Sequence, residues 1–193
     1  MSHIGRMLER ALAQAGLSEL AARALQGEGL PDADLATLVR ADVLLVAGLA
    51  DALRRKERGD DVRLMSTATA ARSHDFVQLN LDAGRSDGPT GEELLREVAL
   101  ARLATPGSQG VALSFDQLGL ELAQTALAFG ADALWGELDG KRTLPLLGSQ
   151  GARRQEIEGL VARSGRRAVW IEALAPGARD GAAPSARELE SRS

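Results

Sequence analysis

The sequence predicts an α/β fold with a short parallel sheet and helices on its outer side. Apolar residues recur at helical spacing through residues 1–60, and from Val62 onward short apolar runs alternate with amphipathic helical segments. Short strands that alternate with helices pair in parallel through right-handed crossovers. At 193 residues the chain has room for one good domain and not for two ordinary ones.

The N-terminal segment, residues 1–60, is expected to be helical throughout. Gly16 ends the first helix, Ser18 is an N-cap candidate for the second, Pro31 lies where a third can begin, and Asp42 can cap the fourth. The expected helices are one from Ile4 to Gly16, one over 19–26, one that begins at 31–32, and one over 43–58 that Gly59 ends.

Two groups of basic residues are interpreted as solvated helix surface. The fourth helix ends in Arg54, Arg55, Lys56 and Arg58, and cations suit that end of a helix dipole. Arg166 belongs to a second group near the C-terminal end of the chain. A phosphate site at the first group and an anionic partner at the second are the alternatives.

Residues 61–173 are expected to form the α/β part. The predicted strands are 62–65, 76–81, 111–115, 131–136 and 167–171. The predicted helices are one that begins at Thr90 and runs through Leu103, one over 116–130, and one over 153–164. Residues 82–90 read as a loop, and the Ala-, Gly-, Pro- and charge-rich residues 174–193 are expected to be a disordered tail.

Composition excludes several classes of site. The chain has no cysteine, so it has no disulfide, no thiolate zinc site and no cysteine-held iron–sulfur cluster, and its two histidines make an all-histidine metal site unexpected. We expect no cofactor and no metal.

Charge and hydropathy bear on partners and location. A net charge of −4 argues against nucleic acid. The most apolar run, residues 43–50, is far shorter than the ~20 residues that span a bilayer, and no signal peptide is visible, which predicts a cytoplasmic protein.

Several segments together resemble the radical SAM enzymes of menaquinone biosynthesis, the aminofutalosine synthases, dehypoxanthine futalosine cyclases and their deazaflavin-cofactor relatives. Residues 34–42, 49–56 and 59–60 are similar to the N-terminal helices of that family. Residues 76–79 stand where the family has a late barrel strand, 93–103 where it has the next helix, 119–136 at its last strand–helix–strand unit, and 156–167 at its closing helix.

The resemblance implies a partial, half-barrel version of a TIM-barrel fold. A whole barrel needs about 250 residues, and the segment after Met65 runs directly into the late-barrel part. The first strand is therefore expected beside the last three. The family's three-cysteine cluster loop has no counterpart here, so we expect no radical SAM activity, because the electron that cleaves S-adenosylmethionine comes from the cluster.

Residues near the implied pocket depart from the family pattern. Where the family reads Gly-Ala-Asn-Asp-Leu-Gly-Gly-Thr, residues 130–137 read Gly-Ala-Asp-Ala-Leu-Trp-Gly-Glu. An aspartate has become Ala133, a glycine Trp135 and a threonine Glu137. Where the family places a histidine after a late strand, this chain has Asp82.

Candidate binding residues follow from the ends of predicted strands. Asp116, Asp132 and Glu137 are expected at or near carboxyl ends, where α/β folds place ligands. Carboxylates there could bind a cation or move a proton, whereas Asp116 as a helix cap and Glu137 as a solvated side chain are the alternatives. Trp135 could stack on a ligand ring or belong to the core. The full candidate set is Asp82, Ser114, Asp116, Asp132, Trp135 and Glu137.

Two functions remain open at this stage. The first is a non-catalytic accessory or interaction subunit linked to menaquinone (futalosine) biosynthesis, which forms a homodimer or attaches to a full-length radical SAM relative. The second is a cluster-free small-molecule-binding protein or enzyme of quinone-type metabolism that uses the pocket carboxylates. The first rests on an expected bare inner sheet face, which association or the N-terminal helices would cover. We expect that face to carry Leu79, Val111, Leu113, Leu134 and Trp135.

Overall fold

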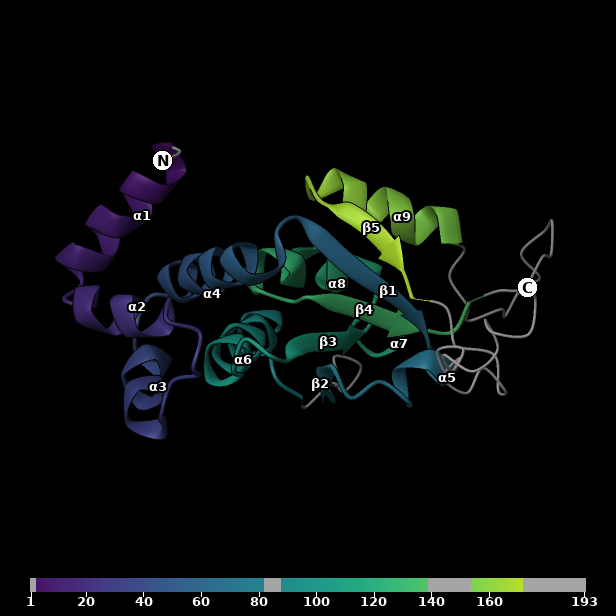
Figure 1. Ribbon diagram of the computed structural model, residues 1–193, viewed down its shortest axis with the longest axis horizontal. Coiled ribbons are helices and arrows are strands. Elements are labelled where there is room, and N and C mark those ends of the chain that lie inside the picture. Colours follow the sequence, from purple (N-terminus) through teal and green to yellow (C-terminus); the bar gives the residue numbers. More distant parts are fainter. Residues whose placement is uncertain (1–2, 82–87, 139–153, 172–193) are drawn as a thin grey trace, which may run out of the picture.

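The structure is a computed structural model that describes residues 3–81, 88–138 and 154–171. Within these residues the sheet has five strands, all parallel, in the order β2-β3-β4-β1-β5 (Figure 1). The strands are β1 (Asp61–Ser66), β2 (Phe76–Leu79), β3 (Gly110–Ser114), β4 (Ala133–Gly136) and β5 (Arg167–Trp170). The predicted α/β fold with a parallel sheet is confirmed.

The first strand lies in the interior of the sheet. Arg63 of β1 is in register with Ala133 of β4 on one side and with Val169 of β5 on the other. The run β2-β3-β4-β1 is the order of the last three strands and the first strand of a parallel barrel. This confirms the partial barrel-like arrangement, to which β5 adds a strand at the free edge of β1.

The helices largely follow the predicted bounds. They are α1 (His3–Gln14), α2 (Ser18–Ala24), α3 (Asp32–Val39), α4 (Val43–Arg58), α5 (Thr67–Ala70), α6 (Gly91–Ala104), α7 (Phe115–Leu118), α8 (Leu120–Ala126), the 3-10 helix η1 (Leu127–Phe129) and α9 (Arg154–Arg163). The helix expected over 116–130 is instead divided between α7 and α8, because Gly119 has φ +77°, outside the helical region.

Local capping explains where the main helices begin. The side chain of Asp42 accepts hydrogen bonds from the N–H groups of Leu44 and Leu45. Thr90 and Glu93 form a reciprocal capping box at the start of α6. The prediction that Ser18 is the N-cap of α2 was wrong. Ser18 is the first helical residue, and the N-cap position before it has no side-chain hydrogen bond.

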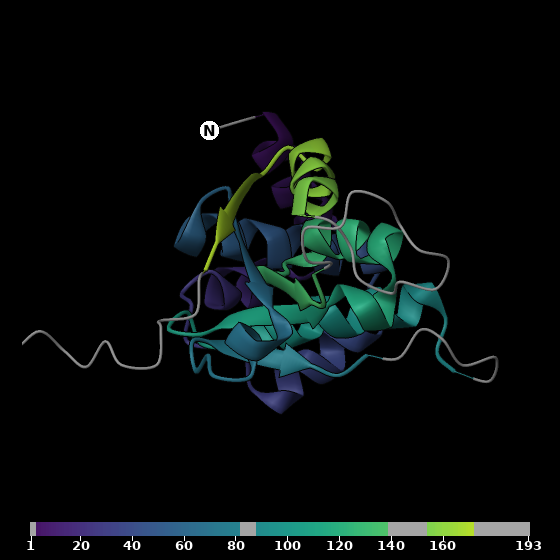
Figure 2. The same ribbon diagram turned by 90° about the vertical axis from the view of Figure 1, so that its right-hand side faces the viewer.

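One hydrophobic core joins the N-terminal helices to the sheet. Helices α6, α8 and α9 pack on one sheet face, whereas α4 packs against α6 and η1 at the amino end of the strands, and α1, α2 and α3 are attached through α4 and α6 (Figures 1 and 2). Val62, Leu64, Val111, Leu113 and Leu134 point into this core and are fully buried. The segment before β1 therefore shares its apolar interior with the α/β part. The tail predicted at 174–193 lies outside the described residues.

The expected composition of the open sheet face was wrong for four of its five residues and right for Trp135. Val111, Leu113 and Leu134 are on the helix-covered face, and Leu79 also packs against the main core. Side chains alternate along a strand, so a shift of one residue moves them all to the other face. The opposite face carries the smaller cluster of Met65, Ala70, Phe76, Ala112 and Ala133, with Trp135 packed against it.

The connection from β1 to β2 crosses that opposite face. We call residues 67–75 the strap. It begins with α5 and passes β4 and β3 before it reaches β2 (Figure 1). Ala70 of the strap is buried in the smaller cluster, and its carbonyl accepts a hydrogen bond from Gln78 Nε2 at 2.6 Å. The strap, rather than the N-terminal helices, thus covers apolar residues of this face.

Candidate functional site

The elements that follow the neighbouring strands β1 and β4 lie on opposite faces of the sheet. The connection that follows β1 is the strap, whereas the helix that follows β4, α9, lies in the main core on the other face. In open parallel sheets a crevice forms at the carboxyl ends of two such strands, and ligands bind there. The topology therefore places the candidate site between the ends of β1 and β4, which face the viewer in Figure 2.

A cleft of about 530 Å³ lies at that position. Its volume is within the range of roughly 300–1,000 Å³ that small-molecule sites occupy. Thr67 follows β1, Ser114 ends β3, and Glu137 follows β4. The complete lining is Thr67, Ser114, Asp116, Gln117, Trp135 and Glu137.

Four of the six candidate residues meet in this cleft: Ser114, Asp116, Trp135 and Glu137. Asp82 lies outside the described residues. The candidate set missed Thr67 and Gln117. Thr67 could have been found from its position two residues after the strand predicted at 62–65, and Gln117 from its place beside Asp116 in the first turn of a helix.

A backbone hydrogen bond fixes the Asp116 carboxylate at the cleft. The N–H of Glu137 donates to Asp116 Oδ2 at 2.7 Å, which ties the start of α7 to the end of β4. Ser114, not Asp116, caps α7, because its Oγ accepts from the N–H of Gln117. The close approach requires Gly136. A Cβ there would lie 2.3 Å from Phe115 Cε2 and 2.7 Å from Asp116 Oδ2.

The cleft walls contain polar atoms without partners among the described residues. Gln117 donates from Nε2 to Asn80 Oδ1 at 2.7 Å, but its Oε1 is buried and accepts no hydrogen bond. Trp135 Nε1 is likewise buried without an acceptor. An unsatisfied buried polar group costs about 1–3 kcal/mol. A ligand or water that reached these atoms would recover part of that cost.

The cleft is acidic. Asp116 and Glu137 are exposed carboxylates, and among the described residues that line the cleft there is no lysine, arginine or histidine. Asp116, Gln117 and Glu137 contribute side-chain acceptor oxygens. Among the described residues, no group of three or more histidine, aspartate and glutamate side chains is arranged to hold a metal ion.

Asp132 does not belong to this cleft. It precedes β4, at the opposite, amino edge of the sheet, because the strand begins at Ala133 and runs away from it. Its Oδ2 accepts from the N–H of Val111 at 2.7 Å, and the side chain is fully buried. Burial raises the pKa of Asp132 and lowers that of Arg102, which lies beside it. Asp132 therefore joins the starts of β3 and β4.

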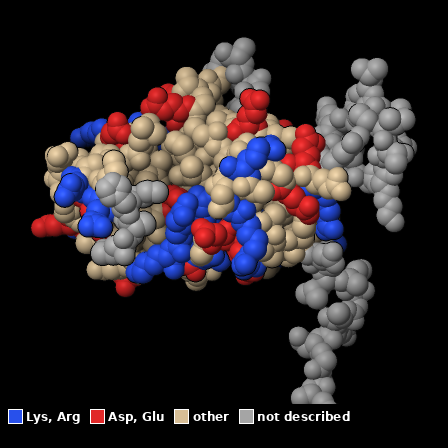
Figure 3. All heavy atoms as spheres, turned by 90° about the horizontal axis from the view of Figure 1, so that it is seen from above, with Lys and Arg blue, Asp and Glu red and all other residues tan. Residues whose placement is uncertain are grey.

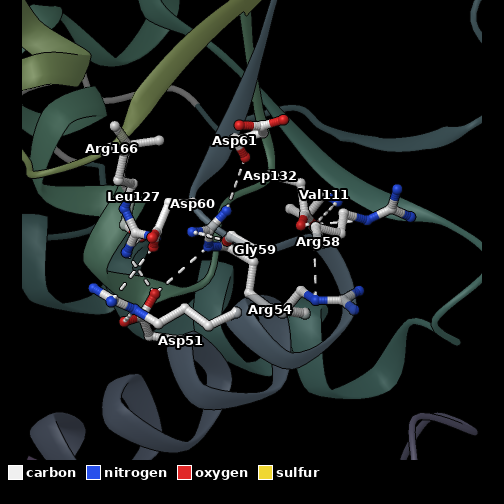
Figure 4. A network of polar contacts seen from close by, with 12 residues as sticks. Asp51, Arg54, Arg58, Gly59, Asp60, Asp61, Val111, Leu127, Asp132 and Arg166 are labelled. Carbon is white, nitrogen blue, oxygen red and sulfur yellow. Dashed lines mark hydrogen bonds and ion pairs between the residues drawn. The ribbon is translucent and has the colours of Figure 1, made fainter. Parts of the chain in front are cut away.

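The amino edge is held by a wider set of buried charges, shown in Figure 4. Arg54 has no solvent exposure, and it donates to the carbonyl oxygens of Gly59 and Asp61, both at 3.0 Å. Arg166 donates from Nη2 to Asp51 Oδ1 at 2.5 Å and to the carbonyl of Leu127 at 2.7 Å. The interpretation of Arg54 and Arg166 as solvated was wrong. Each guanidinium donates to backbone carbonyl oxygens at the amino edge of the sheet, where helix ends and strand starts meet.

Exposed basic residues of the same region lie next to acidic ones. Arg167 donates to Asp61 Oδ1 at 2.6 Å, and Arg55 donates to Asp51 Oδ2 at 2.9 Å. Figure 3 shows basic and acidic side chains mixed on the face that it presents. Phosphate binding uses clustered basic side chains, and these two arginines are instead paired with carboxylates.

No family model matches the chain, and no curated protein matches it. The resemblance to radical SAM enzymes of menaquinone biosynthesis therefore stays a prediction. In the described part of the chain, no helix is both long and apolar enough to cross a membrane.

Proposed function

We propose that this protein binds a small organic molecule in the cleft at the carboxyl ends of β1, β3 and β4, without an iron–sulfur cluster. The observation that carries this proposal is the fixed position of Asp116, whose carboxylate the Glu137 N–H holds at the switch point of the sheet. The cleft supplies carboxylate, amide and hydroxyl oxygens and the indole of Trp135. These groups select and orient a ligand.

The experiment is a screen of small molecules by ¹H–¹⁵N NMR. The chain has two tryptophans, so its two indole N–H signals separate the cleft from the rest of the surface. A ligand of the cleft shifts the Trp135 signal and leaves that of Trp170 in place, and Trp135→Phe assigns the two. Glu97→Gln, an exposed change on α6, is the matched control for cleft variants. A diverse library that never shifts the Trp135 signal would refute the proposal.

An accessory role as a homodimer subunit is the second candidate. It no longer depends on a bare sheet face, because the strap covers apolar residues there. It depends on Met7, Val39 and Leu44, large apolar side chains of α1, α3 and α4 that are 61%, 51% and 69% exposed. These helices lie at the end of the molecule away from the strand tips (Figure 1). A second copy that buried these side chains would remove apolar surface from water.

Light scattering over a hundredfold concentration range tests this candidate. A dimer that Leu44→Glu converts to a monomer would support it, and a wild-type monomer at every concentration would exclude the homodimer. Recovery of a full-length radical SAM relative with the protein would support the other expected partner. Futalosine-pathway genes next to its own gene would support the link to menaquinone biosynthesis.

A further inference from the structure

We propose that the ligand of the cleft is a flat organic cation with several N–H donors, such as an amidinium or guanidinium on an apolar group. This inference rests on the proposed function and adds the chemical class of the ligand. It follows from three properties of the cleft: its charge, its hydrogen-bonding capacity and its indole.

The charge favours a cation. Asp116 and Glu137 contribute two carboxylates, and none of the described residues that line the cleft is basic. The hydrogen bond from the Glu137 N–H occupies Asp116 Oδ2. It leaves Asp116 Oδ1 and both carboxylate oxygens of Glu137 without a hydrogen bond from the described residues.

The hydrogen-bonding capacity favours a donor with more than one N–H. Three neighbouring side chains offer acceptor oxygens, namely Asp116, Gln117 and Glu137, and the Oε1 of Gln117 is buried without a donor. Planar N–H-rich cations bind carboxylates with two parallel hydrogen bonds, which adds both strength and orientation. An ammonium has the charge but not this planar geometry.

The indole favours a flat cation. Trp170, the other tryptophan, provides a comparison within the same chain. The guanidinium carbon of Arg154 lies 4.3 Å from the centroid of the Trp170 ring, and Trp170 Nε1 donates to Glu158 Oε1 at 2.5 Å. Trp135 has carboxylates beside it, but no arginine or lysine of the described residues stacks on its ring. A ligand cation would complete at Trp135 the combination of indole, carboxylate and cation that Trp170 already has.

The test compares three probes of nearly equal shape: benzamidine, which is cationic, benzamide, which is neutral, and benzoate, which is anionic. Each is titrated into the wild-type protein, and the Trp135 indole signal is followed by NMR. We expect benzamidine to bind at least about tenfold more tightly than benzamide, which corresponds to roughly 1.4 kcal/mol. We expect no saturable shift with benzoate.

Variants locate the interaction. Asp116→Asn and Glu137→Gln should each weaken benzamidine about fivefold or more and leave benzamide unchanged, whereas Glu97→Gln should change neither. Higher salt should weaken benzamidine selectively. If benzamide or benzoate shifts Trp135 with equal or higher affinity, the cation class is wrong and binding at the cleft stands. If benzamidine leaves Trp135 unmoved while another library member shifts it, the class is again wrong. If no molecule shifts it, the proposed function itself fails.

Discussion

Arg102 and Asp132 face each other at the amino edge of the sheet, with Arg102 Nε 3.7 Å from Asp132 Oδ2 and neither side chain exposed. Arg102 comes from α6 and Asp132 from the turn before β4. The pair therefore connects the helical layer to the start of a strand. Arg102 also donates to the carbonyl of Gln109 and to Glu57.

Arg102→Met should lower the free energy of unfolding at pH 7 by about 3–5 kcal/mol. The change removes the buried cation that pairs with both Asp132 and Glu57, and it leaves Asp132 with Arg58 as its remaining ion-pair partner among the described residues. Urea denaturation measures the loss. Burial already raises the pKa of Asp132, so its contribution to stability is full below the unfolded pKa and is lost as pH rises through the folded pKa. The variant raises that pKa further, so its deficit should shrink as the pH is lowered. Arg40→Met, at an exposed position, should stay within about 0.5 kcal/mol of wild type.

Glu93→Gln should remove an acid-sensitive contribution to stability. The Glu93 carboxylate accepts from the N–H of Thr90 at 2.7 Å and from its hydroxyl at 2.9 Å, and these hydrogen bonds lower the pKa of Glu93. A lowered folded pKa stabilises the protein above the unfolded pKa, and that contribution disappears as pH falls through the folded pKa. Denaturant midpoints from pH 7 down to pH 3 should therefore fall less steeply in Glu93→Gln than in wild type. Identical slopes, with Glu97→Gln as control, would contradict the capping role.

Gly130→Ala should destabilise the protein more than Gly165→Ala does. Both glycines have positive φ, +93° and +72°, so both substitutions add backbone strain of about 1 kcal/mol. Only Gly130 also lacks room. A Cβ there would lie 3.0 Å from Ala50 Cβ and 3.0 Å from Arg102 Cγ, whereas nothing lies within 4 Å at Gly165. Gly130→Val should be worse than Gly130→Ala. Equal melting midpoints for the two alanine variants would argue against this close packing.

Gln78→Leu should loosen the strap. The change removes the donor to the Ala70 carbonyl and leaves the rest of β2 intact. Hydrogen exchange followed by mass spectrometry should show faster exchange in residues 67–75 and unchanged exchange in α6. If residues 67–75 exchange at the same rate in the variant as in wild type, other contacts hold the strap.

Local sequence signals predicted most elements and part of the site. The strand expected at 111–115 is β3, and Gly130 ends the helical region with a left-handed residue, because apolar runs and glycine stops act over a few residues. The argument that ligands bind at the carboxyl ends of strands correctly identified Ser114 and Glu137 as residues of one cleft. It failed for Asp132, since an aspartate just before a strand and one just after it look alike when the strand is four residues long.

The features that could not be predicted from the sequence depend on contacts between distant parts of the chain. Every residue of β3 is buried, so its sequence has no polar alternation to show which face meets the helices. Arg54 looks like any cation in the last turns of a helix, and its burial depends on the carbonyl of Asp61, which only the folded chain brings to it. Gly119 interrupts a run with helical spacing, and its positive φ is set by the turn into α8.

The interior position of β1 has a consequence for synthesis on the ribosome. β1 is the first strand to leave the exit tunnel, yet its neighbours are Ala133 on one side and Val169 on the other. At about 5–20 residues per second, translation needs several seconds to supply both partners. During that interval both edges of β1 lack their partner strands. The backbone N–H and C=O groups along the β5 edge of β1 therefore have no strand partner until translation passes residue 170.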